Sequence, residues 1–452
     1  MIKLAIKSLL YITYVIGTEL STYSDYPREA FIEQTSSGGR VSPFVLFLLA
    51  PFVAAAISIS LIPVGNMIVM ALGAVVSIAF LLSLARSPLT ITKETLCLIG
   101  FFIWSLVSTL FCEIPGFAAI TLRTQFLILV MVIIISHCAN RIQNIVTMFM
   151  SALLGIAVVA ISAVATGEYQ RAEYTTDRAA GLALNANTFA LALLFGIAIL
   201  LYLFRVWRNL LSRAFIVMLL LVSARLIIAS GSRKGFLGLF VILCIWFWCS
   251  YRRDVWRKPG TAFAVICVFA GVGVFAAIQL QGTFLAKRLQ KLQDVNYEGA
   301  GGSVGIRRQL IQEGIRFTME RPLYGYGPNH FRVHSITNRY AHNNYAEVFA
   351  NTGIPGGMMY YFIYCVLLNR LWRLRQFELG TEEREFVNLS WTIVIYHLLV
   401  QTTVVTYSLK IDWIILAILS GFTTFLYRRS RQMTLVSAKL LDDEATIQAG
   451  RF

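Results

Sequence analysis

Charged side chains are scarce in this sequence of 452 residues, because they make up 14% of it against 57% hydrophobic residues. A soluble domain usually has about 25% charged residues, so this chain lacks the polar surface that a water-soluble globule of its size needs. Soluble enzymes, disordered chains and secreted disulfide scaffolds are therefore excluded. The seven cysteines lie mostly inside apolar runs and show no metal-ligand spacing, which is typical of small buried hydrophobes.

Acidic residues are fewer than basic ones: 23 Asp+Glu stand against 39 Lys+Arg, a formal net charge of 39 − 23 = +16. This excess does not require a nucleic-acid partner, and we predict none. Lys and Arg collect in the cytoplasmic loops of membrane proteins, where a high isoelectric point is expected. The basic balance therefore agrees with a chain embedded in a lipid bilayer.

Long apolar stretches recur along most of the chain, and each is long enough to cross a bilayer core of about 30 Å as a helix. We predict an all-α polytopic membrane protein with about twelve transmembrane helices and one large external loop that contains short helices. The predicted spans lie near residues 44–62, 66–84, 95–112, 117–136, 145–165, 187–204, 213–230, 235–250, 261–280, 353–370, 387–405 and 411–427.

Loop charges predict the orientation, since cytoplasmic loops carry an excess of Lys and Arg. Alternate short connections are basic, for example 252–258 and 370–375, and both termini fall on their side. We therefore predict that both termini are cytoplasmic. The predicted parts are an amphipathic segment on the cytoplasmic membrane surface (1–43), nine spans (44–280), a large external loop (281–352), three spans (353–428) and a cytoplasmic tail (429–452).

The external loop 281–352 carries nine Lys and Arg and five acidic residues, a net charge of 9 − 5 = +4. This charge indicates either a solvated surface or an anionic substrate at the outer face of the membrane. Within the loop, residues 307–320 are expected to form a helix that stops before Pro322. Residues 323–330 (LYGYGPNH) indicate tight turns, and residues 342–348 a further helix.

Polyprenyl-diphosphate sugars are the commonest anionic substrates at the outer face of a bacterial membrane. Arginine suits a diphosphate because its planar fork binds phosphate oxygens bidentately and stays protonated. A metal would need clustered Asp and Glu, which the external segments lack. We therefore predict a metal-free site without a cofactor. Its candidate arginines are Arg178, Arg233 and Arg307, although any one of them could instead be a charge reaching the lipid headgroups.

His342 is the candidate for acid–base work or for hydrogen bonding to a phosphate, because imidazole takes up a proton near neutral pH. His330 and His334 compete with it, since they carry the same side chain in the same loop. A histidine that only caps a helix is the structural alternative. His137, on the predicted cytoplasmic side, and His397, within a span, are interpreted as structural.

Four pieces of the sequence, in this order, resemble the bacterial O-antigen ligase and polysaccharide polymerase superfamily. They are DRAAGLALNANTFA (177–190), SGSRKGFLGL (230–239), SVGIRRQLIQEGIRFTMERPLYGYGPNHF (303–331) and AHNNYAEVFANTGIPGG (341–357). The last is similar to the family's His-Asn, Glu and Gly signature at the end of its large periplasmic loop. Residues 185–188 read Asn-Ala-Asn-Thr where many relatives have Asn-Pro-Asn, which bears on the local turn.

The resemblance implies glycosyl transfer outside the cytoplasmic membrane, from an oligosaccharide on undecaprenyl diphosphate and without a nucleotide sugar. Piece by piece, Arg233 and Arg307 match the family's essential arginines and His342 its essential histidine. Arg178 matches a further arginine, and Asn343 and Glu347 fall on the same motif as His342 in positioning roles. These six residues are the predicted catalytic and substrate-binding site.

The acceptor divides the family into two branches. A polymerase adds the growing chain to another lipid-linked repeat unit and can work with a chain-length regulator, whereas a ligase transfers the chain to lipid A–core. The amino-acid sequences of residues 231–239 and 341–349 resemble those of the polymerase and exopolysaccharide branch more closely. We therefore predict an O-antigen or exopolysaccharide polymerase. The competing class is a lipid-linked glycan transporter or flippase, which twelve spans would also suit.

Overall fold

The computed structural model describes residues 42–60, 62–85, 88–167, 179–183, 185–257 and 303–449, together with residues 260 and 271. The predicted amphipathic segment 1–43 lies almost entirely outside these ranges. The predicted span 261–280 lies outside them apart from residue 271. All residues whose contacts are described below belong to one compact unit, residues 41–84 and 89–452.

Every regular element in these ranges is a helix. The helices are α3 (Pro43–Ser58), α4 (Pro63–Ser83), α5 (Lys93–Thr109), α6 (Pro115–Cys138), α7 (Ile142–Ala165), the 3-10 turn η1 (Gly181–Ala183), α9 (Ala186–Val206), α10 (Leu210–Ala229), α11 (Arg233–Arg257), α14 (Ser303–Glu320), α15 (Phe331–His334), α16 (Asn344–Leu374), α17 (Thr381–Val400) and α18 (Lys410–Ala449). The predicted all-helical class is confirmed.

Local sequence signals explain where these helices begin. Proline stands at the first position of α3, α4 and α6, where its missing N–H leaves no hydrogen bond unmade. Three other helices start at a polar cap: Thr92 Oγ1 accepts a hydrogen bond from Thr95 N (3.1 Å), and Asn185 and Asn209 cap α9 and α10 in the same way (2.8 Å each). Pro115 also fixes the boundary between the third and fourth predicted spans.

Within the described ranges, seven helices are long and apolar enough to cross a membrane: α4, α6, α7, α9, α10, and parts of α11 (Arg233–Tyr251) and α18 (Lys410–Val436). The α9 and α18 segments are 83% buried, whereas the buried share of the α4, α10 and α11 segments is only 22–28%. Two buried helices surrounded by helices with apolar outer faces are typical of a bundle whose solvent is lipid. The chain is thus a multi-pass membrane protein, and the count of twelve spans stays a prediction.

One predicted boundary is confirmed and another differs from the structure. The short helix predicted over 342–348 and the span predicted over 353–370 are separated at Gly353, whose non-helical backbone (φ 68°, ψ −177°) divides α16 into two helical parts. The last helix, α18, continues to Ala449, although we predicted a span to 427 and then a tail. Neither glycine nor proline occurs between 422 and 449, so no residue interrupts the helix after it leaves the apolar region.

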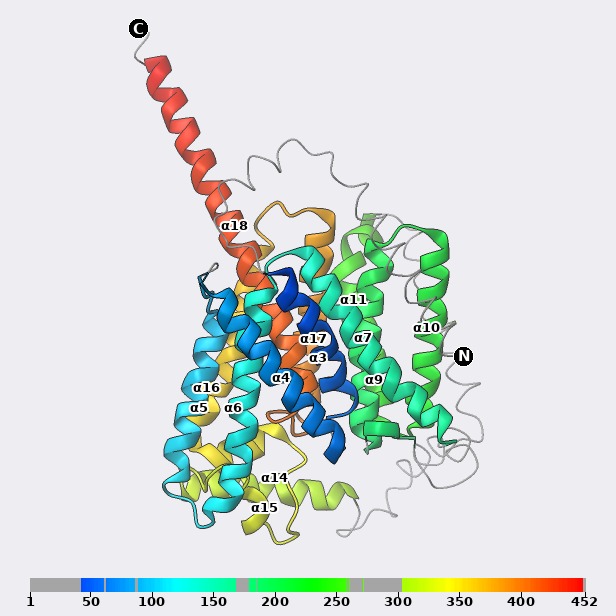
Figure 1. Cartoon of the computed structure of the whole chain (residues 1–452), viewed down its shortest axis with the longest axis vertical. Helices are drawn as coiled ribbons and strands as arrows, with labels where there is room; N and C mark the ends of the chain where they lie inside the picture. The colour runs from blue at the N-terminus through cyan, green and yellow to red at the C-terminus, as the bar shows by residue number, and fades with distance from the viewer. Residues whose placement is uncertain are drawn as a thin grey trace. The chain divides into compact units, whose positions relative to one another are not determined.

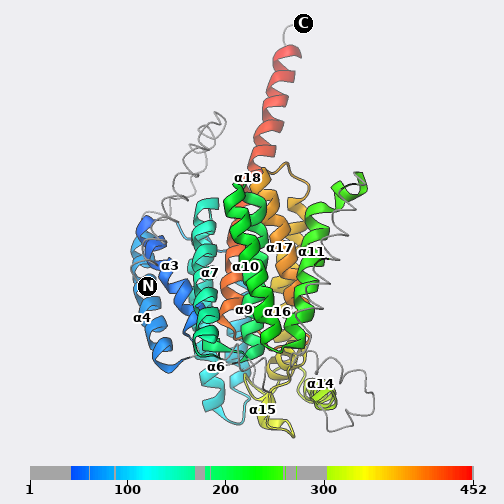
Figure 2. The ribbon, with the colours of Figure 1, turned by 90° about the vertical axis from the view of Figure 1, so that its right-hand side faces the viewer.

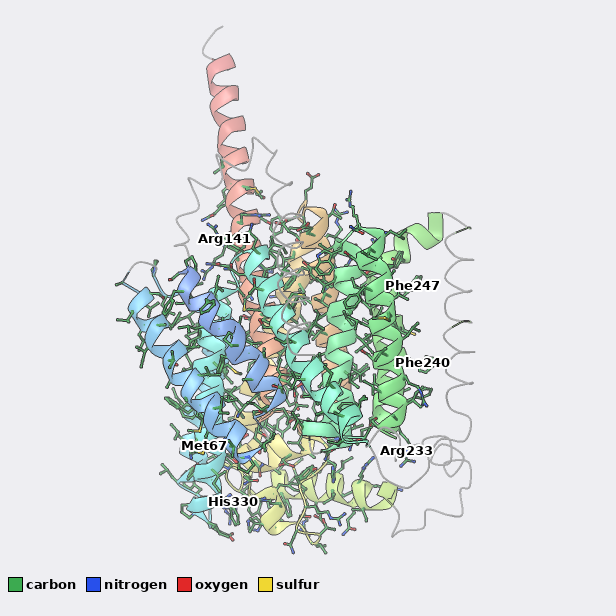
Figure 3. All side chains as sticks on the ribbon, turned by 45° about the vertical axis from the view of Figure 1, so that its right-hand side comes forward. Met67, Arg141, Arg233, Phe240, Phe247 and His330 are labelled. Carbon is green, nitrogen blue, oxygen red and sulfur yellow. The ribbon has the colours of Figure 1, made fainter. Side chains whose placement is uncertain are left out.

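The bundle has two chemically different ends. Arg141 lies at one end, together with the start of the projecting part of α18, and Arg233 and His330 lie at the other (Figures 1 and 3). Helices α14 and α15 cover this second end (Figure 2). At the Arg141 end, three ion pairs link neighbouring helices: Arg205–Glu385 (2.8 Å), Arg370–Glu94 (2.8 Å) and Arg429–Glu383 (2.5 Å). The second end carries the predicted site.

We predict that the end covered by α14 and α15 faces outward, because the short connections at the other end are strongly basic. In a cysteine-free background, Ser303→Cys should react with a membrane-impermeant thiol reagent in intact spheroplasts. Gly380→Cys, on the exposed connection before α17, is the control and should react only after lysis. The reverse pattern would invert the orientation and remove the site from an external substrate.

Candidate active site at the α14–α16 end

A small second core holds the loop elements on the end of the bundle. It is formed by buried side chains of α14, α15, the first part of α16 and the segment before it: Leu310, Phe317, Phe331, Ala341, Ala346 and Ala350. Helix α14 approaches α16 closely at Gly314, where an added Cβ would lie 2.7 Å from the Ala346 Cβ. The predicted helix over 307–320 is therefore present, begins at Ser303, and is packed directly against the helix that follows His342.

The turn that joins α14 to α15 is locked to the bend in α16. Ile354 N donates to Pro322 O (2.7 Å), and Gly327 N donates to Asn351 O (2.8 Å). Gly353 has a left-handed φ, and a Cβ there would lie 2.3 Å from Leu323 O, so the backbones can approach this closely only without a side chain. This fixes the predicted LYGYGPNH turns relative to the residues after His342.

His342 is held in a backbone conformation that few non-glycine residues adopt, with φ 51°. Its ring packs against the ring of Tyr340, with 4.3 Å between the centroids. Burial, followed by the positive charges of Arg307, Lys234 and Arg339, lowers the pKa of His342 to about 4. The imidazole is therefore neutral at physiological pH and can accept a proton or a hydrogen bond.

The structure brings Arg307, in the first turns of α14, into the electrostatic environment of His342. Arg233 is the first residue of α11, is partly buried, and forms no hydrogen bond or ion pair with a described residue. It lies at the same end of the bundle as His330 (Figure 3). Arg178, the third arginine predicted for the site, lies outside the residues that the structure describes.

Asn343 and Glu347 both form hydrogen bonds to backbone groups near His342. Asn343 caps α16, with its Oδ1 accepting from Ala346 N (3.0 Å), and its Nδ2 donates to Thr402 O (3.1 Å). Glu347 is buried, and its Oε2 accepts from Ala341 N (2.7 Å), just before His342. Burial raises the pKa of Glu347 to about 7, against the opposing effects of this hydrogen bond and of Arg332. Both side chains thus hold backbone around His342.

The structure distinguishes the three histidines that the loop sequence leaves equivalent. His330 is fully buried; its Nε2 accepts from Ile114 N (3.1 Å) and its Nδ1 lies 3.0 Å from Pro328 O, so backbone groups occupy both ring nitrogens. His334 lies in α15, 3.7 Å from Glu113, and its ring packs on Tyr326. Of the three, His342 is the one whose environment is set by several cations.

Lys234 is a residue that the sequence reasoning missed. Its Nζ donates to Thr403 O, and its charge is among those that lower the pKa of His342. Two sequence pieces also meet beside it, because Ser232 Oγ lies 2.9 Å from Asn187 Oδ1. The sequence did offer a signal for Lys234, since this residue directly follows the candidate Arg233. It was overlooked because the family resemblance singles out only the arginine.

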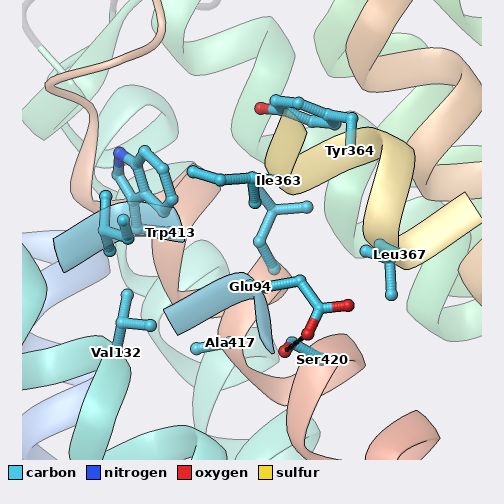
Figure 4. A pocket seen from close by; sticks show the side chains of 10 residues that line it. Glu94, Val132, Ile363, Tyr364, Leu367, Trp413, Ala417 and Ser420 are labelled. Carbon is cyan, nitrogen blue, oxygen red and sulfur yellow. Dashed lines mark hydrogen bonds between the residues drawn. The ribbon is translucent and has the colours of Figure 1, made fainter. Parts of the chain in front are cut away.

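A cavity elsewhere in the bundle does not belong to this site. It is lined by apolar side chains of α5, α6, α16 and α18, together with Glu94 and Ser420 (Figure 4). Ser420 Oγ donates to Glu94 Oε2 (3.0 Å), and Glu94 also pairs with Arg370. The cavity therefore adjoins the ion pairs of the Arg141 end.

No group of three or more His, Cys, Asp or Glu side chains that could hold a metal occurs in the part of the chain described here. Metal independence nevertheless remains a prediction, and its test is direct. Activity should persist in excess chelator, because arginine and lysine charges can replace a cation at a diphosphate. Loss of activity in chelator, with recovery on adding Mg²⁺ or Mn²⁺, would show that an acidic site has been missed.

The fold and the site together define a multi-pass helical membrane protein with a histidine and several cations at one end of its bundle. A family model described as O-antigen ligase matches residues 218–361. That range includes Arg233, Arg307, His342, Asn343 and Glu347, and it confirms the resemblance to the O-antigen ligase and polymerase superfamily. The family implies glycosyl transfer at the bacterial inner membrane. No curated protein matches the chain.

Proposed function

We propose that this protein is a surface-polysaccharide polymerase. It would move an oligosaccharide from undecaprenyl diphosphate onto a hydroxyl of another lipid-linked repeat unit, at the outer face of the membrane and without a metal. The single observation that carries the proposal is a neutral His342 among the positive charges of Arg307, Lys234 and Arg339. A base beside a group of cations suits a reaction in which a hydroxyl attacks and an anionic diphosphate leaves.

The cations serve the leaving group. As the bond between the anomeric carbon and the diphosphate oxygen breaks, its electron pair departs with the lipid diphosphate. Arg307 and Arg233 would bind the phosphate oxygens bidentately and stabilise this charge as it develops. Arg233 suits this role because no described carboxylate neutralises it. Lys234 adds a point charge beside His342.

His342 serves the acceptor. The acceptor oxygen forms the new bond to the anomeric carbon, and its proton passes to the neutral imidazole. A pKa of about 4 in the free protein makes His342 a weak base, and a bound diphosphate would oppose the cations that lower this pKa. The arriving donor would therefore raise the basicity of His342 when it is needed.

We assign a lipid-linked repeat unit as the acceptor because the sequence motifs around Arg233 and His342 resemble those of the polymerase branch. The second candidate is an O-antigen ligase, which would attach the chain to lipid A–core, and the description of the matching family model favours it. The chemistry at the diphosphate is the same in both cases. A chain-length regulator is an expected partner of the polymerase alone.

Purified protein in detergent, mixed with lipid-linked oligosaccharide, tests the proposal. Longer lipid-linked chains formed from this substrate alone would support the polymerase. Product that appears only after lipid A–core is added would mean a ligase. In reconstituted vesicles, movement of the substrate across the bilayer without new glycosidic bonds would contradict both and favour a transporter.

A further inference from the structure

Five buried polar side chains form a connected path that leads from the interior of the bundle toward His342, and the reaction proposed above does not use them. Each is at most 2% exposed, and they come from α16, from α17 with the residue after it, and from α18: Asn344, Tyr364, His397, Gln401 and Asp412. Polar groups this deeply buried in a membrane protein are costly unless they are paired. Their presence therefore calls for a role.

Asn344 joins the path to the site. Its Oδ1 accepts from two backbone groups, Thr406 N (2.9 Å) and Tyr407 N (3.1 Å). Its Nδ2 donates to Gln401 Oε1 (2.9 Å) and to Tyr361 Oη (3.1 Å). All four hydrogen-bonding positions of the amide are therefore used, which fixes its orientation.

The donors and acceptors follow one direction from Asn344 inward. Because Gln401 Oε1 accepts from Asn344, its Nε2 is the group that donates to Tyr364 Oη (2.8 Å). The Tyr364 hydroxyl hydrogen is then available to His397 Nδ1, 3.2 Å away. His397 Nε2 faces the Asp412 carboxylate at 3.4 Å. The backbone N–H groups of Thr406 and Tyr407 can only donate, so they fix the orientation of Asn344 and, through it, the direction of the bonds to Gln401 and Tyr364. His397 Nε2 and Asp412 lie at ion-pair distance but form no hydrogen bond among the described residues.

The outer end of this path holds the connection between α17 and α18, residues 401–409, against the start of α16. Two carbonyl oxygens of that connection contact residues of the site. Thr402 O accepts from Asn343 Nδ2, and Thr403 O accepts from Lys234 Nζ. Gln401 O also accepts from Asn344 N (2.8 Å). Displacing the connection would therefore move both neighbours of His342.

We propose that Asp412, His397, Tyr364, Gln401 and Asn344 are positioning residues, which hold the 401–409 connection so that Asn343 and Lys234 keep His342 aligned for glycosyl transfer. The proposal rests on the proposed function. It assigns to the buried His397–Asp412 pair a role at the external site, rather than in the movement of a substrate through the membrane. None of the five residues touches the reacting atoms.

Tyr364→Phe tests the path, because it deletes one hydroxyl and interrupts the path at its middle. With polymer formation by the purified protein as the assay, kcat should fall about tenfold or more, and KM for the lipid-linked donor should stay nearly constant. Hydrogen exchange at the Thr406 and Tyr407 amides should accelerate. Asn344→Asp, which keeps the acceptor oxygens but removes both N–H donors, should have the same two effects.

Tyr202→Phe is the matched control. Tyr202 is a buried tyrosine of α9 whose hydroxyl has no hydrogen-bond partner in the described ranges, so its loss should change neither kcat nor exchange. The proposal is overturned if Tyr364→Phe and Asn344→Asp keep the wild-type kcat. It is also overturned if they lose activity only in proportion to a lower thermal midpoint or a smaller folded fraction. A wild-type protein that forms no glycosidic bond would instead overturn the proposed function.

Discussion

Arg307→Lys and Arg233→Lys are each expected to reduce polymer formation by roughly ten- to more than a hundredfold while the protein stays folded in the membrane. Lysine keeps the positive charge but cannot hold two phosphate oxygens with a planar fork. A lost charge-assisted hydrogen bond is worth about 1.5–3 kcal/mol, and that difference appears as rate when it is felt in the transition state. The measurement is polymer laddering in a strain deleted for the native gene, with the protein quantified in the membrane fraction.

Arg308→Lys is the matched control for Arg307, because Arg308 is the next residue of α14 and is exposed. Its ladder should be unchanged. Arg339 is a poorer control, because it is exposed but its charge contributes to the low pKa of His342. Normal ladders from both the Arg307 and Arg233 variants would show that these arginines are only surface charge. The transporter alternative would then gain support.

Much of the fold could be predicted because membrane helices are specified locally. An apolar run of sufficient length must satisfy its own backbone hydrogen bonds in lipid, so hydropathy alone locates helices such as α9 and α10. Proline and capping residues then set their beginnings, as at Pro115 and Asn185. The helix over 307–320 follows from the same local signals, together with the stop before Pro322.

The break in α16 could be predicted, but its tertiary partners could not. Glycine is common where a helix ends, and the non-helical backbone of Gly353 separates the two helical parts of α16. In the structure, Gly353 packs against the backbone of Leu323, and Ile354 donates to Pro322, so the chain turns and then continues as helix. These partners are about thirty residues earlier in the chain. Only the tertiary fold brings them together.

The sequence motif proposes the residues of the candidate site, but their geometry could not be predicted. The motif identified His342, Arg307 and Arg233, yet residue chemistry could not separate His342 from His330. That distinction depends on Ile114 N, which occupies His330 Nε2 from a distant connection. Lys234 was likewise missed because its relation to His342 exists only in three dimensions.

The largest loss is expected for His342→Ala, together with a specific pH dependence in the wild-type protein. A positioned base typically contributes about 10²- to 10⁴-fold, so the alanine variant should form almost no polymer. His334→Ala should retain far more activity, because His334 faces Glu113 and not the cations of the site. In the free protein the pKa of His342 is about 4, below its usual value of 6.5. The acidic limb of kcat/KM, which reports on the free protein, should therefore lie near pH 4 rather than near 6.5.

Lys234→Gln tests the cause of this shift. The Lys234 charge disfavours the protonated imidazole, so its removal raises the pKa of His342, and the acidic limb should move toward higher pH. Arg308→Gln, the control, should leave the limb in place. Glu347 titrates near pH 7, so the comparison is repeated in Glu347→Gln to separate its ionisation from that of His342. An acidic limb near pH 6.5 in the wild type, unmoved by Lys234→Gln, would show that the cations do not act on the catalytic base, and that a different residue takes the acceptor proton.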